Sequence, residues 1–186
     1  MNSQLDYEIN NELGECYLFM GELDKARDYY NKAAGSNGSH PDPYLGLATI
    51  EVQEGNLENA RKLYEKAARI VENDKSYAGM GLIEMENGSK EESFKHFLKA
   101  LELNPENMIA LFGLVQVGHI IGKIEETLPY LENYLRLDPD NHDVRYSLAG
   151  SLYQLNRLEE TRENLERILE SDPGHKAARE LMDQIG

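Results

Sequence analysis

The chain has 186 residues, of which 40% are hydrophobic, 28% charged and only 8% aromatic, with no tryptophan. This apolar content is enough to offset chain entropy, which excludes a disordered chain and favours a soluble, helix-rich protein. The formal net charge of −15 repels phosphate backbones, so we expect no nucleic acid partner. An acidic surface favours basic protein segments, or serves solubility alone.

The cysteine content and the N-terminal residues bear on the compartment. A lone cysteine, Cys16, allows no internal disulfide and suggests a reducing environment. The first residues, Met1 to Asp6, have neither the basic segment nor the apolar core of a signal peptide. No stretch approaches the roughly 20 apolar residues that span a bilayer. We therefore expect a cytoplasmic protein without membrane insertion.

A turn signal recurs along the chain at Gly21, Gly55, Gly88, Gly122 and Asn156, with spacings of 34, 33, 34 and 34 residues. Glycine and asparagine suit a helix C-terminus at which the backbone turns left-handed. Five residues after each turn stands a small residue: Ala26, Ala60, Ser93, Thr127 and Thr161. Nine residues after it stands a bulky one: Tyr30, Tyr64, Phe97, Leu131 and Leu165. The pattern predicts two closely packed amphipathic helices per unit, with the bulky residue between them.

In chain order, the units differ around their second helices. The first unit ends in a segment from Gly35 to His40 without a proline, so we expect its second helix to stop early. The second unit is one residue short, and the third and fifth end in Pro105 and Pro173. The fourth carries Pro129 inside its second helix, which should bend that helix or delay its start. A capping helix is expected at residues 175–184.

This arrangement resembles the tetratricopeptide repeat (TPR) family over nearly the whole chain. The resemblance implies an all-α fold, a right-handed α-solenoid of five helical hairpins plus a C-terminal capping helix, in a single domain over residues 1–186. The repeats are expected at residues 7–40, 41–73, 74–107, 108–141 and 142–175. No single hairpin can bury its apolar stripe, so neighbouring units must stack.

In proteins that this sequence resembles, the first helices line a concave face that binds peptides or partner helices. In the first three repeats that face would carry Glu8, Asn11, Glu15, Leu18, Phe19, Asp42, Leu45, Thr49, Val52, Gln53, Lys75, Ala78, Leu82, Met85 and Glu86. In the last two it would carry Ile109, Phe112, Gln116, His119, Ile120, Asp143, Tyr146, Gly150, Tyr153 and Gln154.

We expect the partner-binding residues on the third to fifth repeats. They are Lys75, Leu82, Met85, Ile109, Phe112, Gln116, His119, Ile120, Tyr146 and Tyr153. Exposed apolar patches typically mark interaction sites, and an apolar groove with polar edges suits an amphipathic helix or an extended segment. Burial of these side chains against one another and self-association are the alternatives.

The resemblance therefore implies an interaction scaffold that binds an apolar, basic-flanked segment of a partner protein, with service as an assembly chaperone among its uses. The alternative is a self-assembling homo-oligomeric scaffold. Co-chaperone members of the family clamp a C-terminal carboxylate, but only Lys75 matches that clamp here. We therefore do not expect acidic C-termini as ligands.

Motifs for catalysis or cofactor binding are missing from the sequence. None of the five histidines lies within three to five residues of another histidine or of Cys16 on a shared face. The glycines stand singly at turn register and form no phosphate loop, and no nucleophile motif is present. We expect no enzyme, no metal site and no cofactor.

Two acidic residues interrupt the apolar pattern of the first helices. Glu51 and Glu84 stand four residues before the turn glycine in adjacent repeats. They would form a carboxylate pair, reach solvent, or pair with a base such as Arg61 or Lys62.

Three glycines, Gly46, Gly79 and Gly113, share a register inside first helices. Each costs about 1 kcal/mol relative to alanine, which indicates a close approach to the helix backbone. Either the neighbouring repeat or a bound segment would make that approach.

Overall fold

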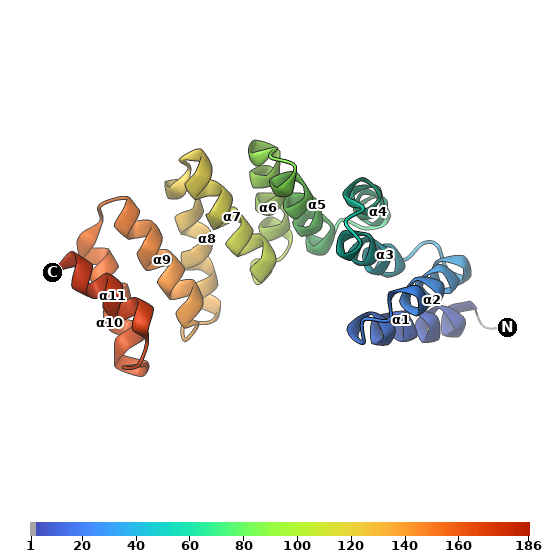
Figure 1. The fold of residues 1–186 in the computed structure, drawn as a ribbon, viewed down its shortest axis with the longest axis horizontal. Helices are drawn as coiled ribbons and strands as arrows, with labels where there is room; N and C mark the ends of the chain where they lie inside the picture. The colour runs from blue at the N-terminus through green and yellow to red at the C-terminus, as the bar shows by residue number, and fades with distance from the viewer. Residues whose placement is uncertain (1–2) are drawn as a thin grey trace. The chain divides into compact units, whose positions relative to one another are not determined.

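The computed structural model describes residues 3–186, which fold into eleven helices without a strand in that range (Figure 1). The helices group into two compact units, one ending at Leu103 and the other beginning at Asn104. The first unit contains α1 (Ser3–Phe19), α2 (Leu23–Ser36), α3 (Asp42–Gln53), α4 (Leu57–Ile70), α5 (Asp74–Glu86) and α6 (Lys90–Leu103). The second contains α7 (Met108–Ile121), α8 (Ile124–Leu137), α9 (His142–Gln154), α10 (Leu158–Ser171) and α11 (Lys176–Ile185).

Each unit is built from helix hairpins that stack on one another. In the first unit α1, α3 and α5 pair with α2, α4 and α6, and α2 and α4 also pack against the first helix of the next hairpin. In the second unit α7 pairs with α8 and α9 with α10, while α11 packs on α10. The predicted all-α hairpins and capping helix are thus confirmed. The single domain over residues 1–186 stays a prediction.

The turn within each hairpin has the backbone that the sequence predicted. The four turn glycines have φ between 75° and 82°, and Asn156 has φ 58°. At Gly21, the N–H of Glu22 donates to the carbonyl of Tyr17 at 2.9 Å and the N–H of Gly21 to that of Leu18 at 3.0 Å. These two bonds form a Schellman motif, which satisfies carbonyls at the end of the first helix. The left-handed conformation lets the second helix begin two residues later.

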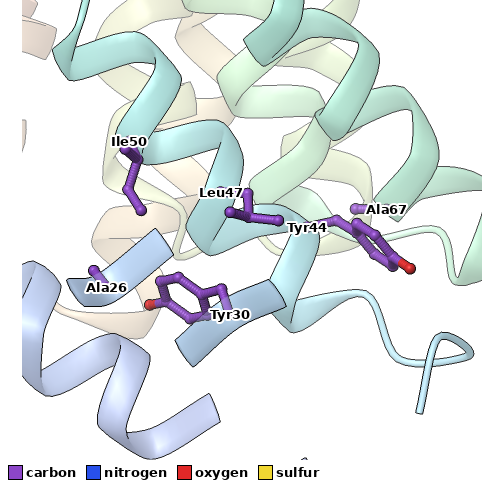
Figure 2. Close-up of a cluster of buried hydrophobic side chains, with 6 residues drawn as sticks. All are labelled: Ala26, Tyr30, Tyr44, Leu47, Ile50 and Ala67. Atoms are coloured by element: carbon purple, nitrogen blue, oxygen red, sulfur yellow. The ribbon is translucent and has the colours of Figure 1, made fainter. Parts of the chain in front are cut away.

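Within each unit, the core lies between the two helices of each hairpin and between successive hairpins. The small residues five positions after each turn are all fully buried, and each bulky residue nine positions after it is at most 9% exposed. Figure 2 shows how this continues into the next hairpin: Ala26 and Tyr30 of α2 face Ile50 of α3, and Tyr44 extends toward Ala67 of α4. One bulky residue therefore serves two interfaces.

Glycines make room for the ring of Tyr30 on both sides. A Cβ atom placed on Gly14, in the same hairpin, would lie 2.7 Å from that ring. A Cβ atom on Gly46, in the next hairpin, would lie 2.2 Å from it. Tyr64 approaches Gly79 in the same way, with 2.4 Å to a placed Cβ. For Gly46 and Gly79, the prediction of close approach by the neighbouring repeat is confirmed.

The structure contradicts the early end expected for the second helix of the first unit, and it contradicts the delayed start that was one of two effects expected of Pro129. A bend in α8, the other expected effect, stays a prediction. The helix α2 does not stop early: it extends through Ser36 and has 14 residues, as α4 does. Between α2 and α3, only residues 37–41 lie outside a regular helix. Pro129 does not delay α8, which begins at Ile124, two residues after its turn glycine. Here the turn, rather than the proline, determines where the helix starts.

Candidate functional site

A pocket of about 180 Å³ lies on the first helices of the unit that ends at Leu103. We call it the first-helix pocket, and its lining comes from α1, α2, α3 and α5: Glu15, Leu18, Tyr30, Asp42, Leu45, Gly46, Thr49 and Lys75. All of these except Tyr30 and Gly46 are residues that the family resemblance placed on the concave face. Tyr30 was not expected on this face, because its helix is the second of its hairpin.

The tyrosine reaches the pocket because Gly46 carries no side chain. Without a Cβ at that position, the ring of Tyr30 approaches the backbone of α3 and becomes part of the pocket wall. Burial raises the pKa of Tyr30 to about 12, and the nearby carboxylates of Glu15 and Asp42 contribute to the rise. The wall is therefore an uncharged ring beside two negative charges.

The two carboxylates are held by hydrogen bonds from α1. The Nδ2 of Asn11 donates to Oε1 of Glu15 at 3.0 Å, and the hydroxyl of Tyr7 donates to Oδ2 of Asp42 at 3.0 Å. Both acidic side chains are exposed. Lys75, also exposed, lines the pocket from α5 and has no ion pair within residues 3–186. The pocket thus offers two oriented acceptors and one free cation.

Apolar side chains continue this surface along the same helices. Phe19, at the end of α1, is 95% exposed, and Val52 of α3 is 36% exposed. On α5, Leu82 is 38% exposed and Met85 is half-buried. Leu82, Met85 and Lys75 are the predicted partner-binding residues that lie in this unit.

The other predicted partner-binding residues lie in the unit that begins at Asn104. On α7, Ile109 is 57% and Ile120 is 51% exposed, Gln116 is exposed and Phe112 is half-buried. On α9, Tyr153 is 36% exposed. When this unit is considered by itself, these side chains are exposed or half-buried, so a partner protein can reach them. Whether they bind one stays a prediction.

His119 and Tyr146, also predicted to bind a partner, make contacts inside the second unit. The Nε2 of His119 lies 3.0 Å from the Oγ of the buried Ser151, which connects α7 to α9. Burial lowers the pKa of His119, because the charged imidazolium loses solvation. The ring of Tyr146 lies 5.6 Å from that of His175 and packs against the cluster that holds α11 in place. A substitution at Tyr146 would therefore disturb the capping helix as well as the surface.

Glu51 is buried and paired with a base, but the base is not the one that the sequence suggested. Its carboxylate forms an ion pair with Arg27 of the preceding hairpin and accepts a hydrogen bond from Asn59 at 3.4 Å. Arg27 also binds Glu54 at 2.6 Å. The hydrogen bond from Arg27 lowers the pKa of Glu51. This ion pair joins the first two hairpins, and neither Arg61 nor Lys62 takes part in it.

Among residues 3–186, no three His, Cys, Asp or Glu side chains gather as a metal ion would require. No helix in that part of the chain is long and apolar enough to cross a membrane.

Two mammalian proteins show sequence similarity to the chain. It is 32% identical over 110 residues to the BBSome complex member BBS4 of Bos taurus, a match that covers 59% of this chain and 21% of the bovine protein. The mouse protein of the same name is 35% identical over 65 residues, which are 35% of this chain and 12% of that protein. The chain thus corresponds to about a fifth of the bovine relative's length.

Solved structures share the fold at low sequence identity. PilF of Pseudomonas aeruginosa superposes with a TM-score of 0.76 at 23% identity, covering 91% of this chain and 78% of PilF. YrrB, described as a TPR protein with an unusual peptide-binding site, has a TM-score of 0.70 at 21% identity, covering 94% of this chain and 90% of YrrB.

Three family models, each describing a tetratricopeptide repeat, match residues 11–75, 74–107 and 122–185. Together they cover most of the chain, including the capping helix, but leave out residues 108–121, which form α7. The chain belongs to the tetratricopeptide repeat family.

Proposed function

We propose that the chain is a protein-interaction module whose first helices bind a segment of another protein that carries basic and apolar side chains. A scaffold for protein partners is what the fold supports in general. The observation that carries the finer proposal is the first-helix pocket, where Glu15 and Asp42 stand beside the uncharged ring of Tyr30.

The chemistry of the pocket suits a lysine or arginine side chain of the partner. The aliphatic stem of such a residue would pack along Leu18 and Leu45, and its charge would lie between Glu15 and Asp42. The stem and the charge thus match different parts of one pocket. Lys75, on the other side, favours a partner that presents a carbonyl or carboxylate oxygen next to its basic residue.

Apolar residues of the same segment would contact the side chains beyond the pocket. Phe19 is the most exposed of these, and it lies on α1, the helix that also carries Glu15. An exposed aromatic side chain gains from burial in an interface, since such residues dominate interface energetics. Basic and apolar features of the partner would therefore bind to adjacent parts of one surface.

A short fluorescent peptide of leucine and lysine is a suitable probe, with a leucine–glutamate peptide for comparison. We expect Glu15→Gln to weaken binding of the lysine peptide about fivefold, as for an exposed ion pair. Phe19→Ser should weaken both peptides. The matched control is Glu166→Gln, which removes the same charge from an exposed position on α10.

If Glu166→Gln weakens binding as much as Glu15→Gln does, the peptide responds only to net charge and the pocket is not its site. Equal binding of the leucine–lysine and leucine–glutamate peptides would also mean that the pocket is not the binding site. In cell extracts, affinity capture with mass spectrometry should show proteins that wild type retains and Glu15→Gln loses.

Self-assembly is the second candidate, and the exposed apolar side chains of α7 favour it. Ile109 and Ile120 are each more than half exposed on that helix. A second copy that covered them would form a homo-oligomer. Sedimentation of the protein over a wide concentration range tests this function, and a strict monomer throughout excludes it. In an oligomer, Ile120→Glu should restore the monomer.

A further inference from the structure

A cleft lined by arginines lies in the unit that begins at Asn104, and its lining residues come from α8, α9 and α10. It has a volume of about 310 Å³, and its lining includes Arg136, Arg145 and Arg167 together with Glu132. We call it the arginine cleft. A neighbouring cavity shares Arg145 and Arg167 with it and is also lined by the acidic residues Asp140 and Glu170. This site is separate from the first-helix pocket, which lies in the other unit.

Arg145 is buried, and within residues 3–186 no carboxylate lies at ion-pair distance from it. Arg145 is only 8% exposed. One guanidinium nitrogen donates to the carbonyl of Pro139 at 2.5 Å and the other to Oδ1 of Asn164 at 3.4 Å, and within residues 3–186 it has no ion pair. Burial and the positive charge of Arg167 lower the pKa of Arg145, and only Asp140 acts in the opposite direction. A buried charge without a counter-charge is costly, so this guanidinium favours an anion nearby.

The other two arginines of the cleft are also unpaired with acids. Arg136 donates to Oδ1 of Asn133 at 3.0 Å, and neither Arg136 nor Arg167 has an ion pair in the described part of the chain. They remain without ion pairs in that part although the chain has 34 acidic residues against 19 lysines and arginines. Three arginines and Glu132 give the lining of the cleft a formal charge of +3 − 1 = +2. The lining of the arginine cleft itself is thus positive, although Asp140 and Glu170 line the cavity next to it.

We propose that the arginine cleft binds a phosphate group, either free or carried on a partner's side chain. A phosphate dianion matches the formal charge of the lining, whereas a single carboxylate would leave part of it uncompensated. Three phosphate oxygens accept the forked N–H groups of several guanidinium side chains at once. Arg145 has donors to offer because a guanidinium carries five N–H groups and two hydrogen bonds are made inside the protein.

The first test follows the arginine side-chain N–H signals by NMR during titration with inorganic phosphate at constant ionic strength. We expect saturable shifts at Arg145 and at Arg136 or Arg167. Because Arg145 holds the Pro139 carbonyl, the variants are the exposed Arg136→Gln and Arg167→Gln, each expected to raise the half-saturating phosphate concentration about tenfold. Arg69→Gln removes the same charge in the other unit, from a side chain 79% exposed, and should change nothing.

Shifts that grow in proportion to concentration without saturation, or that acetate reproduces, would overturn the proposal. Equal effects of Arg136→Gln, Arg167→Gln and Arg69→Gln on the half-saturating phosphate concentration would also overturn it. A second titration compares a phosphoserine peptide with the same peptide carrying serine or glutamate. Tighter binding of the phosphopeptide than of inorganic phosphate identifies a phosphorylated partner as the source. Equal binding of the two identifies free phosphate, and equal binding of the glutamate peptide overturns the preference for phosphate.

Discussion

The substitution Gly46→Ala tests the packing that joins the first two hairpins. The added methyl group would lie 2.2, 2.4 and 2.5 Å from three ring carbons of Tyr30. Carbon atoms pack at about 3.5–4.0 Å, so the ring would need to retreat by more than about 1 Å. It has little room to do so, because the ring also lies close to Gly14, where a placed Cβ would be 2.7 Å away. The strain therefore falls on the interface between the hairpins.

The net effect is the difference of two terms. Overpacking of a well-filled core costs about 1–3 kcal/mol, and a ring clamped on both sides belongs at the upper end. Replacing a mid-helix glycine by alanine contributes about 1 kcal/mol in the other direction. We therefore expect Gly46→Ala to lower the free energy of unfolding by about 2 kcal/mol.

Urea unfolding followed by circular dichroism measures this change. The matched control is Gly150→Ala, also in the middle of a first helix but with nothing within 4 Å of the added methyl, so it should stabilise the protein by about 1 kcal/mol. Tyr30→Leu provides a double-mutant cycle in which the second substitution should recover much of the loss. If Gly46→Ala is as stable as Gly150→Ala, the clamped ring does not limit the interface and the reasoning is refuted.

Three further substitutions or titrations probe other contacts. In urea unfolding at pH 7, Glu51→Gln should lower the free energy of unfolding by about 1–3 kcal/mol. Because Arg27 lowers the pKa of Glu51 from 4.5, the difference in stability between wild type and variant should shrink as the pH falls below 4.5. A difference that stays constant with pH would contradict the ion pair. By NMR, His119 should titrate below 6.5, since burial disfavours its charged form. The unfolded chain then binds the proton more readily than the folded protein, so the free energy of unfolding should decline as the pH falls through 6.5. Leu181→Ala should cost about 2 kcal/mol and speed hydrogen exchange in α11, and unchanged exchange would mean that this side chain does not hold the capping helix.

The hairpins were predictable because local chemistry determines them. A residue that tolerates positive φ at Gly21 and at Asn156 fixes where one helix ends and the next begins. The small residue at Ala26 and the bulky one at Tyr30 then specify which sides of the helices meet. Each of these signals lies within one repeat, so a single period of the sequence contains them all. The family resemblance placed the acidic residues Glu15 and Asp42 on one face, and both line the first-helix pocket.

Contacts between repeats were less predictable, because they depend on pairs of residues that share no register. The partner of Glu51 is Arg27, which lies 24 residues earlier on a second helix, whereas the sequence drew attention to bases on the following helix. The contact of Tyr146 with the cluster that holds the capping helix was not evident from its own repeat, because α11 lies two elements later in the chain. The arginine cleft gave no signal, since Arg136, Arg145 and Arg167 come from three helices and follow no common spacing.

The ring of Tyr30, shared between Gly14 and Gly46, also bears on how a chain of this kind changes its length. Removing residues 41–73 would bring Gly79 to the position of Gly46, 16 residues after Tyr30, so the same ring would meet another glycine without any compensating substitution. Loss or duplication of a whole unit is therefore compatible with the contact, while insertion of one residue within α3 would move a side chain into the ring. The interface can thus be inherited or engineered as a transferable module, provided that it is cut at whole periods.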